Sequence, residues 1–519
     1  MTGSSRPTRN TERSRVAGLL LAALAALSSH ALGAALPWAA ATAPTVYVAT
    51  TGNDQNPGTL TSPMRTIQHA VANATPGTTI LVRGGVYHEQ VNLTRSGSAA
   101  GGYITLQNYV GEKPVIDGTG LQLPSGSTTG LFTLSDVSYV KLIGFEIRNL
   151  SSGSADVVPA GIFVTGAGNH LLITNNYVHH IQTTVNSSDG NAFGIAVYGT
   201  RAPASINALS IDSNEVAYLT TGSSESLTLN GNVQNFIVSH NRVHDNNNIG
   251  IDMIGYEGTA PNTAYDRARD GLVSANTVYN ISSYGNPAYG NNYSADGIYV
   301  DGGTRITIER NAVSHADIGI EVASEHGGRL SDFVTVRSNV ISYSNLTGLS
   351  IGGYDGSRGG TDSCTIVNNT LYGNDTQQSG TGEFIVQYHA TRNQFKNNIV
   401  YANDQGLFFN EATSYATAPV VLDGNLYFSS ADPSALSWNW NGNSYGTLAD
   451  FVTGSGNDHQ SQYADPQFVN VTAGNFRTSA TSPAVDHGLN LGSAVFGTLD
   501  FAGNARVQGK GVDIGAYER

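Results

Sequence analysis

The sequence predicts an all-β protein, a parallel β-helix solenoid with a capping segment at each end, because two short phrases recur along it and its composition is unusual. In the first phrase an Asn precedes any residue and then an aliphatic one, at intervals of 27 to 38 residues: Asn176, Asn214, Asn241, Asn276, Asn311, Asn339, Asn369 and Asn398. Only 12% of the 519 residues are charged and 61 are Gly. This composition excludes a coiled coil and a highly charged disordered chain.

The second phrase is usually Gly, aliphatic, any residue, aliphatic, and its copies begin at Gly161, Gly194, Ser226, Gly250, Gly297, Gly319, Gly348, Glu383 and Gly406. Alternation with a period of two is typical of strands, and no helical spacing competes over these windows. Stacking the repeats as coils about 4.8 Å apart buries the aliphatic residues and leaves the recurrent Asn in a turn. We expect each Asn to adopt a left-handed conformation and to bond the next coil. A β-propeller is the alternative fold, but its blades would be longer and antiparallel.

Residues 1–43 are expected to be a secretory signal peptide rather than part of the fold. Arg6, Arg9, Arg13 and Arg15 precede an apolar run, and a small-residue cleavage site ends at Ala43. An uncleaved N-terminal anchor is the alternative, because the apolar stretch is long. Removing this segment takes four Arg and one Glu from a chain of net charge -14, which leaves -17. We therefore expect an acidic protein, secreted or periplasmic, that has no stable membrane insertion and does not bind nucleic acid.

The rest of the chain divides into a β-helix over residues 44–425, with its N-terminal cap at about 45–91, and C-terminal coils with a capping segment over 426–519. Caps are expected because an open terminal coil would present unpaired strand edges. Cys364 is the single cysteine, which excludes an intramolecular disulfide and a thiolate zinc cluster. We expect a monomer.

The sequences of both ends resemble those of secreted right-handed parallel β-helix proteins. At the N-terminus these are the segments starting at Tyr47, Thr66, Pro76 and Gly84, and at the C-terminus those starting at Asp465, Ser482, Asp500 and Asp513. This class contains pectate-lyase-like polysaccharide lyases and several glycoside hydrolases. The resemblance implies a right-handed coil and a polysaccharide substrate, and it leaves the reaction open.

Outward-facing residues of the repeats contain an acidic cluster. In the second phrase the variable residue points outward, and so does the residue after the second aliphatic. The first outward column contains Asp252, Tyr299 and Glu321, and ends at Phe408; the second contains Asn230, Asp301 and Gln387. Asp252, Asp301 and Glu321 occupy three consecutive coils in a chain with few charges.

We expect Asp301, Glu321 and Asp252 to be catalytic, as the acid and base of a glycoside hydrolase. The backbone of Asp301 would lie about 8 Å from those of the other two, and such spacing suits an inverting glycosidase, although side chains can lean enough to leave the stereochemistry open. Grouped carboxylates can also bind calcium, so Asp252, Asp301 and Glu321 are the ligands if calcium is bound. A third alternative is a solvated, non-catalytic carbohydrate-binding face.

Other polar and aromatic residues are placed to contact the substrate in the same groove. His326, beside Glu325, is the alternative proton-transfer group. The expected substrate contacts are Glu225, Asn230, Tyr256, Glu257, Asp296, Tyr299, Glu325, His326, Tyr354, Gln387 and His389.

Hydrolysis of a neutral or weakly charged polysaccharide, without a required cofactor, is favoured over lyase action. The resemblance implies that a lyase would use calcium and a Lys or Arg base, but Lys113, Lys141, Lys396 and Lys510 all fall outside the outward columns near the acids. Arg267, Arg269, Arg305 and Arg329 remain as candidate bases. A calcium-dependent polysaccharide lyase is therefore the first alternative.

Overall fold

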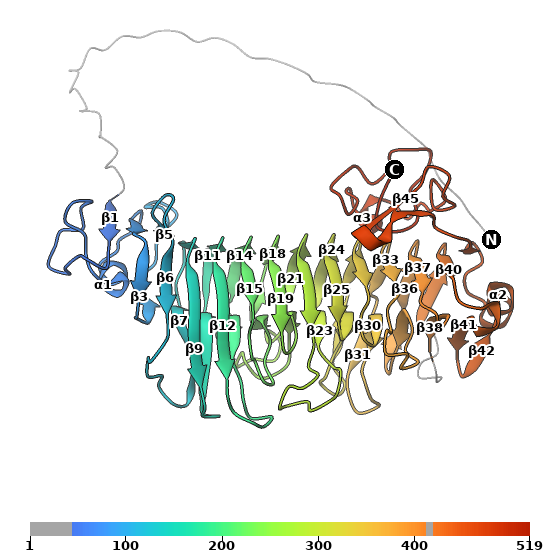
Figure 1. The fold of residues 1–519 in the computed structure, drawn as a ribbon, viewed down its shortest axis with the longest axis horizontal. Helices are drawn as coiled ribbons and strands as arrows, with labels where there is room; N and C mark the ends of the chain where they lie inside the picture. The colour runs from blue at the N-terminus through green and yellow to red at the C-terminus, as the bar shows by residue number, and fades with distance from the viewer. Residues whose placement is uncertain (1–43, 412–418) are drawn as a thin grey trace, which may run out of the picture. The chain divides into compact units, whose positions relative to one another are not determined.

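The computed structural model describes residues 44–411 and 419–519, so the expected signal peptide lies outside the described residues. The chain is a right-handed parallel β-helix, as predicted, and Figure 1 shows its coils stacked along one axis. The coils contribute strands to three sheets, here called sheet 1, sheet 2 and sheet 3, which are parallel except for one antiparallel pair at the C-terminal end of sheet 1. The inward-facing aliphatic residues form one continuous core from Val48 to Phe451.

The strands of sheet 1, in spatial order, are β4 (Val91–Leu93), β7 (Ser127–Ser135), β10 (Val157–Thr165), β13 (Phe193–Gly199), β16 (Leu227–Gly231), β20 (Ile251–Ile254), β23 (Asp296–Asp301), β26 (Ile318–Ala323), β30 (Thr347–Gly352), β34 (Phe384–Val386), β38 (Leu407–Asn410), β41 (Ser437–Trp440) and β42 (Asn443–Tyr445). Those of sheet 2 are β3 (Gly85–Tyr87), β6 (Pro114–Asp117), β9 (Glu146–Ser152), β12 (Tyr177–Thr183), β15 (Glu215–Ala217), β19 (Arg242–Asn246), β22 (Thr277–Ile281), β25 (Ala312–Ala316), β29 (Val340–Ser342), β33 (Thr370–Tyr372), β37 (Ile399–Ala402), β40 (Leu426–Ser429) and β43 (Gln462–Tyr463).

Sheet 3 contains β1 (Thr45–Val48), β2 (Thr79–Val82), β5 (Ile104–Asn108), β8 (Val140–Ile143), β11 (Gly168–Thr174), β14 (Ile206–Asp212), β17 (Val233–Gln234), β18 (Ile237–Ser239), β21 (Arg269–Ser274), β24 (Thr304–Glu309), β27 (Leu330–Asp332), β28 (Thr335–Arg337), β31 (Gly360–Asp362), β32 (Thr365–Val367), β35 (Ala390–Thr391), β36 (Asn393–Lys396) and β39 (Val420–Asp423). A separate hairpin near the C-terminus pairs β44 (Phe468–Asn470) with β45 (Asn475–Thr478).

The recurrent Asn residues form a ladder at the turn between sheets 3 and 2, as predicted. From Asn214 to Asn425, the Oδ1 atom of each ladder Asn accepts hydrogen bonds from the backbone N–H and the Nδ2 of the Asn one coil earlier, at 2.9–3.3 Å. The prediction that each ladder Asn has a left-handed backbone conformation is wrong, because the left-handed residue is the one before it. Positive φ angles fall on the residue before each ladder Asn, such as Ser213 and Arg310, because the chain turns there before the Asn side chain meets the next coil.

The outward columns of sheet 1 follow the predicted register over most of their length. Asp252 pairs with Tyr299, and Tyr299 pairs with Glu321. The expectation fails for Phe408, which is fully buried, while Asn410 pairs with Ile385 in the first column. The pairing of β38 shifts register at an irregularity, which allows the aromatic side chain to join the core.

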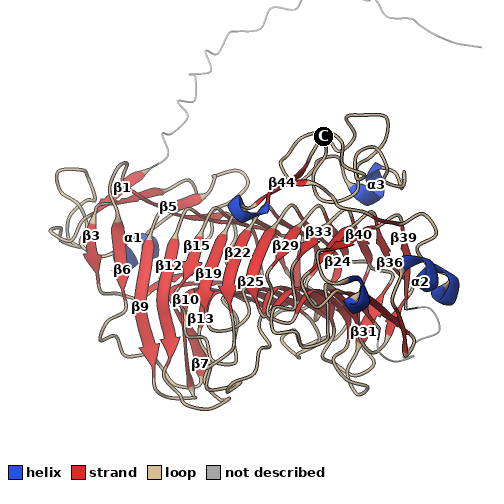
Figure 2. Cartoon of the chain, turned by 45° about the vertical axis from the view of Figure 1, so that its right-hand side comes forward, coloured by secondary structure: helices blue, strands red, loops and turns tan. Residues whose placement is uncertain are grey.

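The two ends of the solenoid are covered by different structures. The helix α1 (Ile67–Ala72) packs against β4 at the N-terminal end, with Thr66 as its N-cap. At the other end α2 (Leu448–Ser455) packs on β41 and β42 and buries Phe451. Figure 2 shows α1 and α2 at opposite ends of the solenoid. Three further short helices are η1 (Pro433–Ala435), η2 (Val471–Ala473) and α3 (Ser493–Phe496).

The last part of the chain packs along the side of the solenoid rather than across its end. Phe476 and Tyr517 form an apolar cluster with Val340 of sheet 2, and α3 contacts β32 of sheet 3. None of the helices in the described residues is long and apolar enough to cross a membrane.

We predict that Asn311→Ala lowers the free energy of unfolding by about 3 kcal/mol, because it leaves buried hydrogen-bonding groups of two neighbouring coils without a partner. The Asn311 side chain is fully buried and bonds Asn276, Asn339 and the Val273 carbonyl oxygen. Chemical denaturation measures the effect, with the exposed Asn291→Ala as the control. Equal stabilities of the two variants would contradict a structural role for the ladder.

Candidate functional site

The three acids that the sequence predicts to be catalytic lie on the outward side of sheet 1, in β20, β23 and β26. Asp252, Asp301 and Glu321 are nevertheless buried, at 2%, 5% and 7% exposure, because loops that follow these strands cover them. Among the described residues, none of the three forms an ion pair with a basic side chain. Buried carboxyls without counter-charges favour the protonated form.

Glu321 is the most hydrogen-bonded acid of the cluster. Its Oε1 accepts hydrogen bonds from the Ser350 hydroxyl at 2.7 Å and from the Gln387 amide at 3.2 Å. Its carboxyl also shares a hydrogen bond with Asp296, which is 2% exposed. Burial raises the pKa of Glu321 to about 7, and these hydrogen bonds to its ionised form limit the rise.

Asp296 and Asp252 have no such support for an ionised form. Burial, and then the neighbouring Glu321 charge, hold the pKa of Asp296 well above its ordinary value. The pKa of Asp252 is also well above its ordinary value, through burial and then the charges of Glu225 and Asp301. One oxygen of each, Oδ1, is buried without a hydrogen-bond partner among the described residues. Both acids therefore favour the protonated form more strongly than an exposed Asp does.

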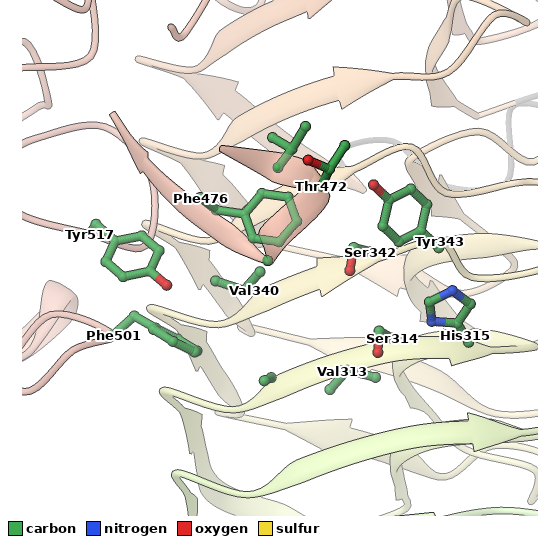
Figure 3. A pocket seen from close by; sticks show the side chains of 13 residues that line it. Val313, Ser314, His315, Val340, Ser342, Tyr343, Thr472, Phe476, Phe501 and Tyr517 are labelled. Carbon is green, nitrogen blue, oxygen red and sulfur yellow. The ribbon is translucent and has the colours of Figure 1, made fainter. Parts of the chain in front are cut away.

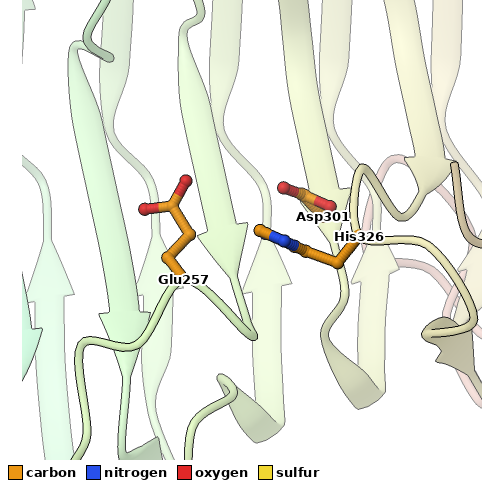
Figure 4. A group of neighbouring side chains, drawn as sticks. All are labelled: Glu257, Asp301 and His326. Carbon is orange, nitrogen blue, oxygen red and sulfur yellow. The ribbon is translucent and has the colours of Figure 1, made fainter.

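Asp301 faces a different set of neighbours from Glu321. Its Oδ1 accepts a 2.7 Å hydrogen bond from the backbone N–H of Glu325. Burial is the main cause that raises its pKa well above the ordinary value, and the charge of Glu325 adds to it. One ligand atom each of Asp301, Glu257 and His326 lie within 4.8 Å of one another, and Figure 4 shows the His326 ring reaching toward the two carboxylates.

The calcium ligands that the sequence predicts are not brought together in this way. Within residues 44–411 and 419–519, the Glu257, Asp301 and His326 group alone combines three such side chains at this spacing, and it omits Asp252 and Glu321. Calcium takes six to eight oxygen ligands, so a group that includes an imidazole does not fit it. Loops decide which acids meet. The loops after β20 and β26 bring Glu257 and His326 to Asp301, whereas Asp252 and Glu321 lie on strands that are two coils apart.

Glu225 and Asn230 lie at one end of the cluster beside a cavity of about 310 Å³, which Tyr198, Glu257 and Ile254 also line. Burial and the charge of Glu257 raise the pKa of Glu225 to about 8. The Nδ2 of Asn230 donates a 2.9 Å hydrogen bond to Glu257. This volume lies at the small end of the range typical of ligand sites.

The other predicted contact residues are distributed unequally around the acids. Tyr299 is 4% exposed, so it fills the column between Asp252 and Glu321 rather than offering the open contact surface expected of a substrate-binding residue. Tyr256 is half-buried, with the guanidinium groups of Arg267 and Arg329 each 5.0 Å from its ring centroid.

Two predicted contacts lie at the rim of the site. Tyr354 is exposed, and its ring lies 4.5 Å from the guanidinium of Arg358. The exposed His389 has its Nε2 3.1 Å from the carbonyl oxygen of Gly356, so the structure places it beside the loop after β30 and not within the acidic cluster.

Most of the candidate bases are held elsewhere. Arg267 donates to the carbonyl oxygens of Gly302, Gly303 and Leu330 and to Asp332. Arg269 bonds Asn232 and Gln234, and Arg305 pairs with Asp270 on sheet 3. The four lysines also lie outside sheet 1, with Lys141 in β8 and Lys396 in β36. Among the described residues, Arg329 is thus the one predicted Arg base whose side chain has no hydrogen bond or ion pair, and its guanidinium lies 5.0 Å from the Tyr256 ring centroid.

Two residues of the site were not predicted from the sequence. Ser350 follows Glu321 in the first column, so the repeat predicts its position. The repeat does not predict that its hydroxyl donates a hydrogen bond to Glu321. Arg358 donates to the backbone oxygen of Glu325 at 3.3 Å from the loop after β30. No strand periodicity predicts the position of a loop residue.

A second pocket, of about 340 Å³, lies between β25, β29 and the C-terminal segment (Figure 3). Its walls are largely apolar and include Val313, Val340, Phe476 and Phe501. The titratable side chains that line it are His315, Tyr343 and Tyr517, without a carboxylate. The carboxyls that acid–base chemistry needs are therefore found in the acidic cluster on sheet 1 and not in this pocket.

Family models and known proteins together match nearly the whole described chain. A family model described as "Pel9A-like, right handed beta helix region" matches residues 46–224, and one described as "Right handed beta helix region" matches residues 266–448. The uncharacterized protein YwoF of Bacillus subtilis (strain 168) is 41% identical over 439 residues, which cover 85% of this chain and 92% of that protein. Pectate lyase PEL9 of Emericella nidulans is 30% identical over 174 residues, 30% of this chain and 40% of the lyase.

The solved structures to which the chain is similar are more distant in sequence. The crystal structure of pectate lyase Pel9A is 16% identical, with a TM-score of 0.46, and the match covers 92% of this chain and 97% of that one. The GH136 lacto-N-biosidase from Eubacterium ramulus is 14% identical, with a TM-score of 0.48 and coverage of 74% and 64%.

We predict that the free energy of unfolding decreases as the pH rises from about 5 to 8. The pKa of Glu321 is about 7 in the folded protein and 4.5 ordinarily, so the folded state binds more protons in this range. The stability that this proton contributes is present below pH 4.5 and is lost as the pH rises through 7. The charged and titratable groups around Glu321 are Asp296, Tyr299, Asp301 and Glu325.

Thermal melting between pH 5 and 8 measures this effect. Glu321→Gln keeps the shape of the side chain and removes its titration, so its melting temperature should depend less steeply on pH than that of the unmodified protein. Parallel pH profiles for the two proteins would contradict the pKa assigned to Glu321.

Proposed function

Because the chain belongs to the right-handed β-helix proteins related to pectate lyase Pel9A, a carbohydrate-active family, we propose that it is a secreted glycoside hydrolase. Its substrate is a neutral or weakly charged polysaccharide that binds along the outward side of sheet 1. The observation that carries this proposal is the pair Asp252 and Glu321, two buried carboxyls in one column. Hydrogen bonds limit the rise in the pKa of Glu321, whereas neighbouring charges add to the rise in the pKa of Asp252.

Different environments assign different roles to the two carboxyls. Asp252 lacks hydrogen-bond donors that would stabilise a charge, so burial favours its protonated form and it is the general acid that donates to the glycosidic oxygen. Glu321 has its ionised form stabilised by Ser350, Gln387 and Asp296, so it is the general base that takes a proton from water. A base with a pKa of about 7 suits catalysis near neutral pH.

The spacing of the pair supports inversion at the anomeric carbon. Asp252 and Glu321 are two coils apart, which places their backbones about 9.6 Å from each other. An inverting enzyme needs carboxyls about 6.5 to 9.5 Å apart, which leaves room for a water molecule between the base and the sugar, and the backbone spacing of the pair is close to the upper end of this range. Asp301 is the alternative acid, but its side chain faces Glu257 and His326, which favours Asp252 for this role.

A calcium-dependent polysaccharide lyase is the second candidate function, and the 30% identity to a segment of pectate lyase PEL9 favours it. A lyase would need a base that removes a carbon-bound proton, and Arg329 and Arg358 are the residues beside the groove that could supply it. An acidic groove repels a polyuronate unless a cation intervenes, which favours the hydrolase.

We predict that the mature protein produces reducing ends from at least one neutral polysaccharide in a panel of neutral and acidic glycans. The products should lack the ultraviolet absorbance of an unsaturated uronate. Both signals are read with and without a calcium chelator. Unsaturated products that form only without chelator would establish the calcium-dependent lyase. Absence of both reducing ends and unsaturated products across the panel would favour a non-catalytic binding protein.

Once a substrate is found, Glu321→Gln and Asp252→Asn should each lower kcat by about 10²–10⁴-fold with KM little changed, because each removes one proton-transfer group. The rise of kcat/KM with pH that the unmodified enzyme shows near pH 7 should disappear in Glu321→Gln. Glu411→Gln is the matched control, since burial also raises the pKa of Glu411 to about 7 but this acid lies in a distant coil. Retained turnover in both site variants would refute the assignment.

A further inference from the structure

We propose that Glu257, Asp301 and His326 bind a divalent transition-metal ion of the Zn²⁺ type in the groove of sheet 1. This site does not depend on the proposed hydrolysis. Its three residues come from successive coils: Glu257 follows β20, Asp301 ends β23, and His326 follows β26. One ligand atom from each lies within 4.8 Å of the other two (Figure 4).

The state of the His326 ring is the independent observation that points to a ligand. Its Nε2 is buried, and no hydrogen bond joins the ring to any residue of 44–411 or 419–519. A buried ring nitrogen without a partner is costly, and neutral imidazole is a common metal ligand. Asp252, which interacts electrostatically with Asp301 and Glu257, is 2% exposed and also has an unpartnered oxygen.

Contacts around the three side chains position two of them for binding. The Nδ2 of Asn230 donates to Glu257, and the N–H of Glu325 donates to Asp301. Asp266 accepts hydrogen bonds from the N–H groups of Gly258 and Ala260, at 2.6 and 2.8 Å, and so holds the loop that contains Glu257. Supporting hydrogen bonds of this kind orient metal ligands.

The residue types determine which ion fits. Two carboxylates and one imidazole suit Zn²⁺, Mn²⁺ or Co²⁺, whereas Ca²⁺ prefers oxygen ligands alone. Three protein ligands leave at least one coordination position for water or a sugar oxygen. The ion would also offset the mutual repulsion of the nearby acids Glu225, Asp252 and Glu325.

Isothermal titration of the chelator-stripped full chain with Zn²⁺ alone, without any glycan, tests the proposal. We expect one equivalent to bind more tightly than Ca²⁺, and Co²⁺ to acquire the visible absorption of a protein-bound ion. His326→Ala should weaken Zn²⁺ binding by at least about 100-fold. The exposed His459→Ala is the control and should bind as the unmodified protein does.

A second variant keeps the test decisive if His326→Ala does not fold. Glu257 is exposed, so Glu257→Gln should fold normally and still weaken Zn²⁺ binding. Glu321→Gln should keep Zn²⁺ affinity whatever its turnover, which separates this site from the proposed acid and base. Absence of stoichiometric Zn²⁺ binding, tighter binding of Ca²⁺, or unchanged affinity in Glu257→Gln would overturn the proposal.

Discussion

The stacking of successive coils in register is the constraint on which the rest of this structure depends. Backbone pairing alone would allow neighbouring strands to slip, and a slip of one residue would turn every side chain to the opposite face. The Asn ladder restricts this freedom, because each Asn bonds both the backbone and the side chain of an Asn in the adjacent coil. The same register aligns Asp252, Tyr299 and Glu321 into one column.

The distribution of charge differs between the sheets. On sheets 2 and 3, neighbouring coils place opposite charges together, as in Arg242 with Glu215 and Arg337 with Glu309. On sheet 1, the acids of neighbouring coils face one another without bases. Like charges in adjacent strands are destabilising, and burial makes the cost larger. A protein retains such an arrangement where it serves binding or catalysis, which supports the assignment of the functional site to this sheet.

The loops, rather than the strands, make the acids chemically different from one another. The β-helix supplies evenly spaced positions, and the segments after β20, β26 and β30 then add Glu257, His326 and Arg358 from outside the repeat. Hydrogen-bond donors reach Glu321 and Asp301 but leave one oxygen of Asp252 without a partner. A regular scaffold with irregular loops therefore accounts for the two separate sites that we propose within one groove, one for proton transfer and one for a metal ion.

The sequence by itself determined the fold class, the Asn ladder and the first column of sheet 1 as far as Ile385, because a two-residue period and a repeated Asn depend on local chain geometry. It also placed Asp252, Asp301 and Glu321 on one face. Only the tertiary structure decided that these acids are buried, that Asp301 meets Glu257 and His326, and that Phe408 turns into the core. These outcomes depend on how loops cover the sheet and where the register shifts, and such contacts join residues that no local period relates.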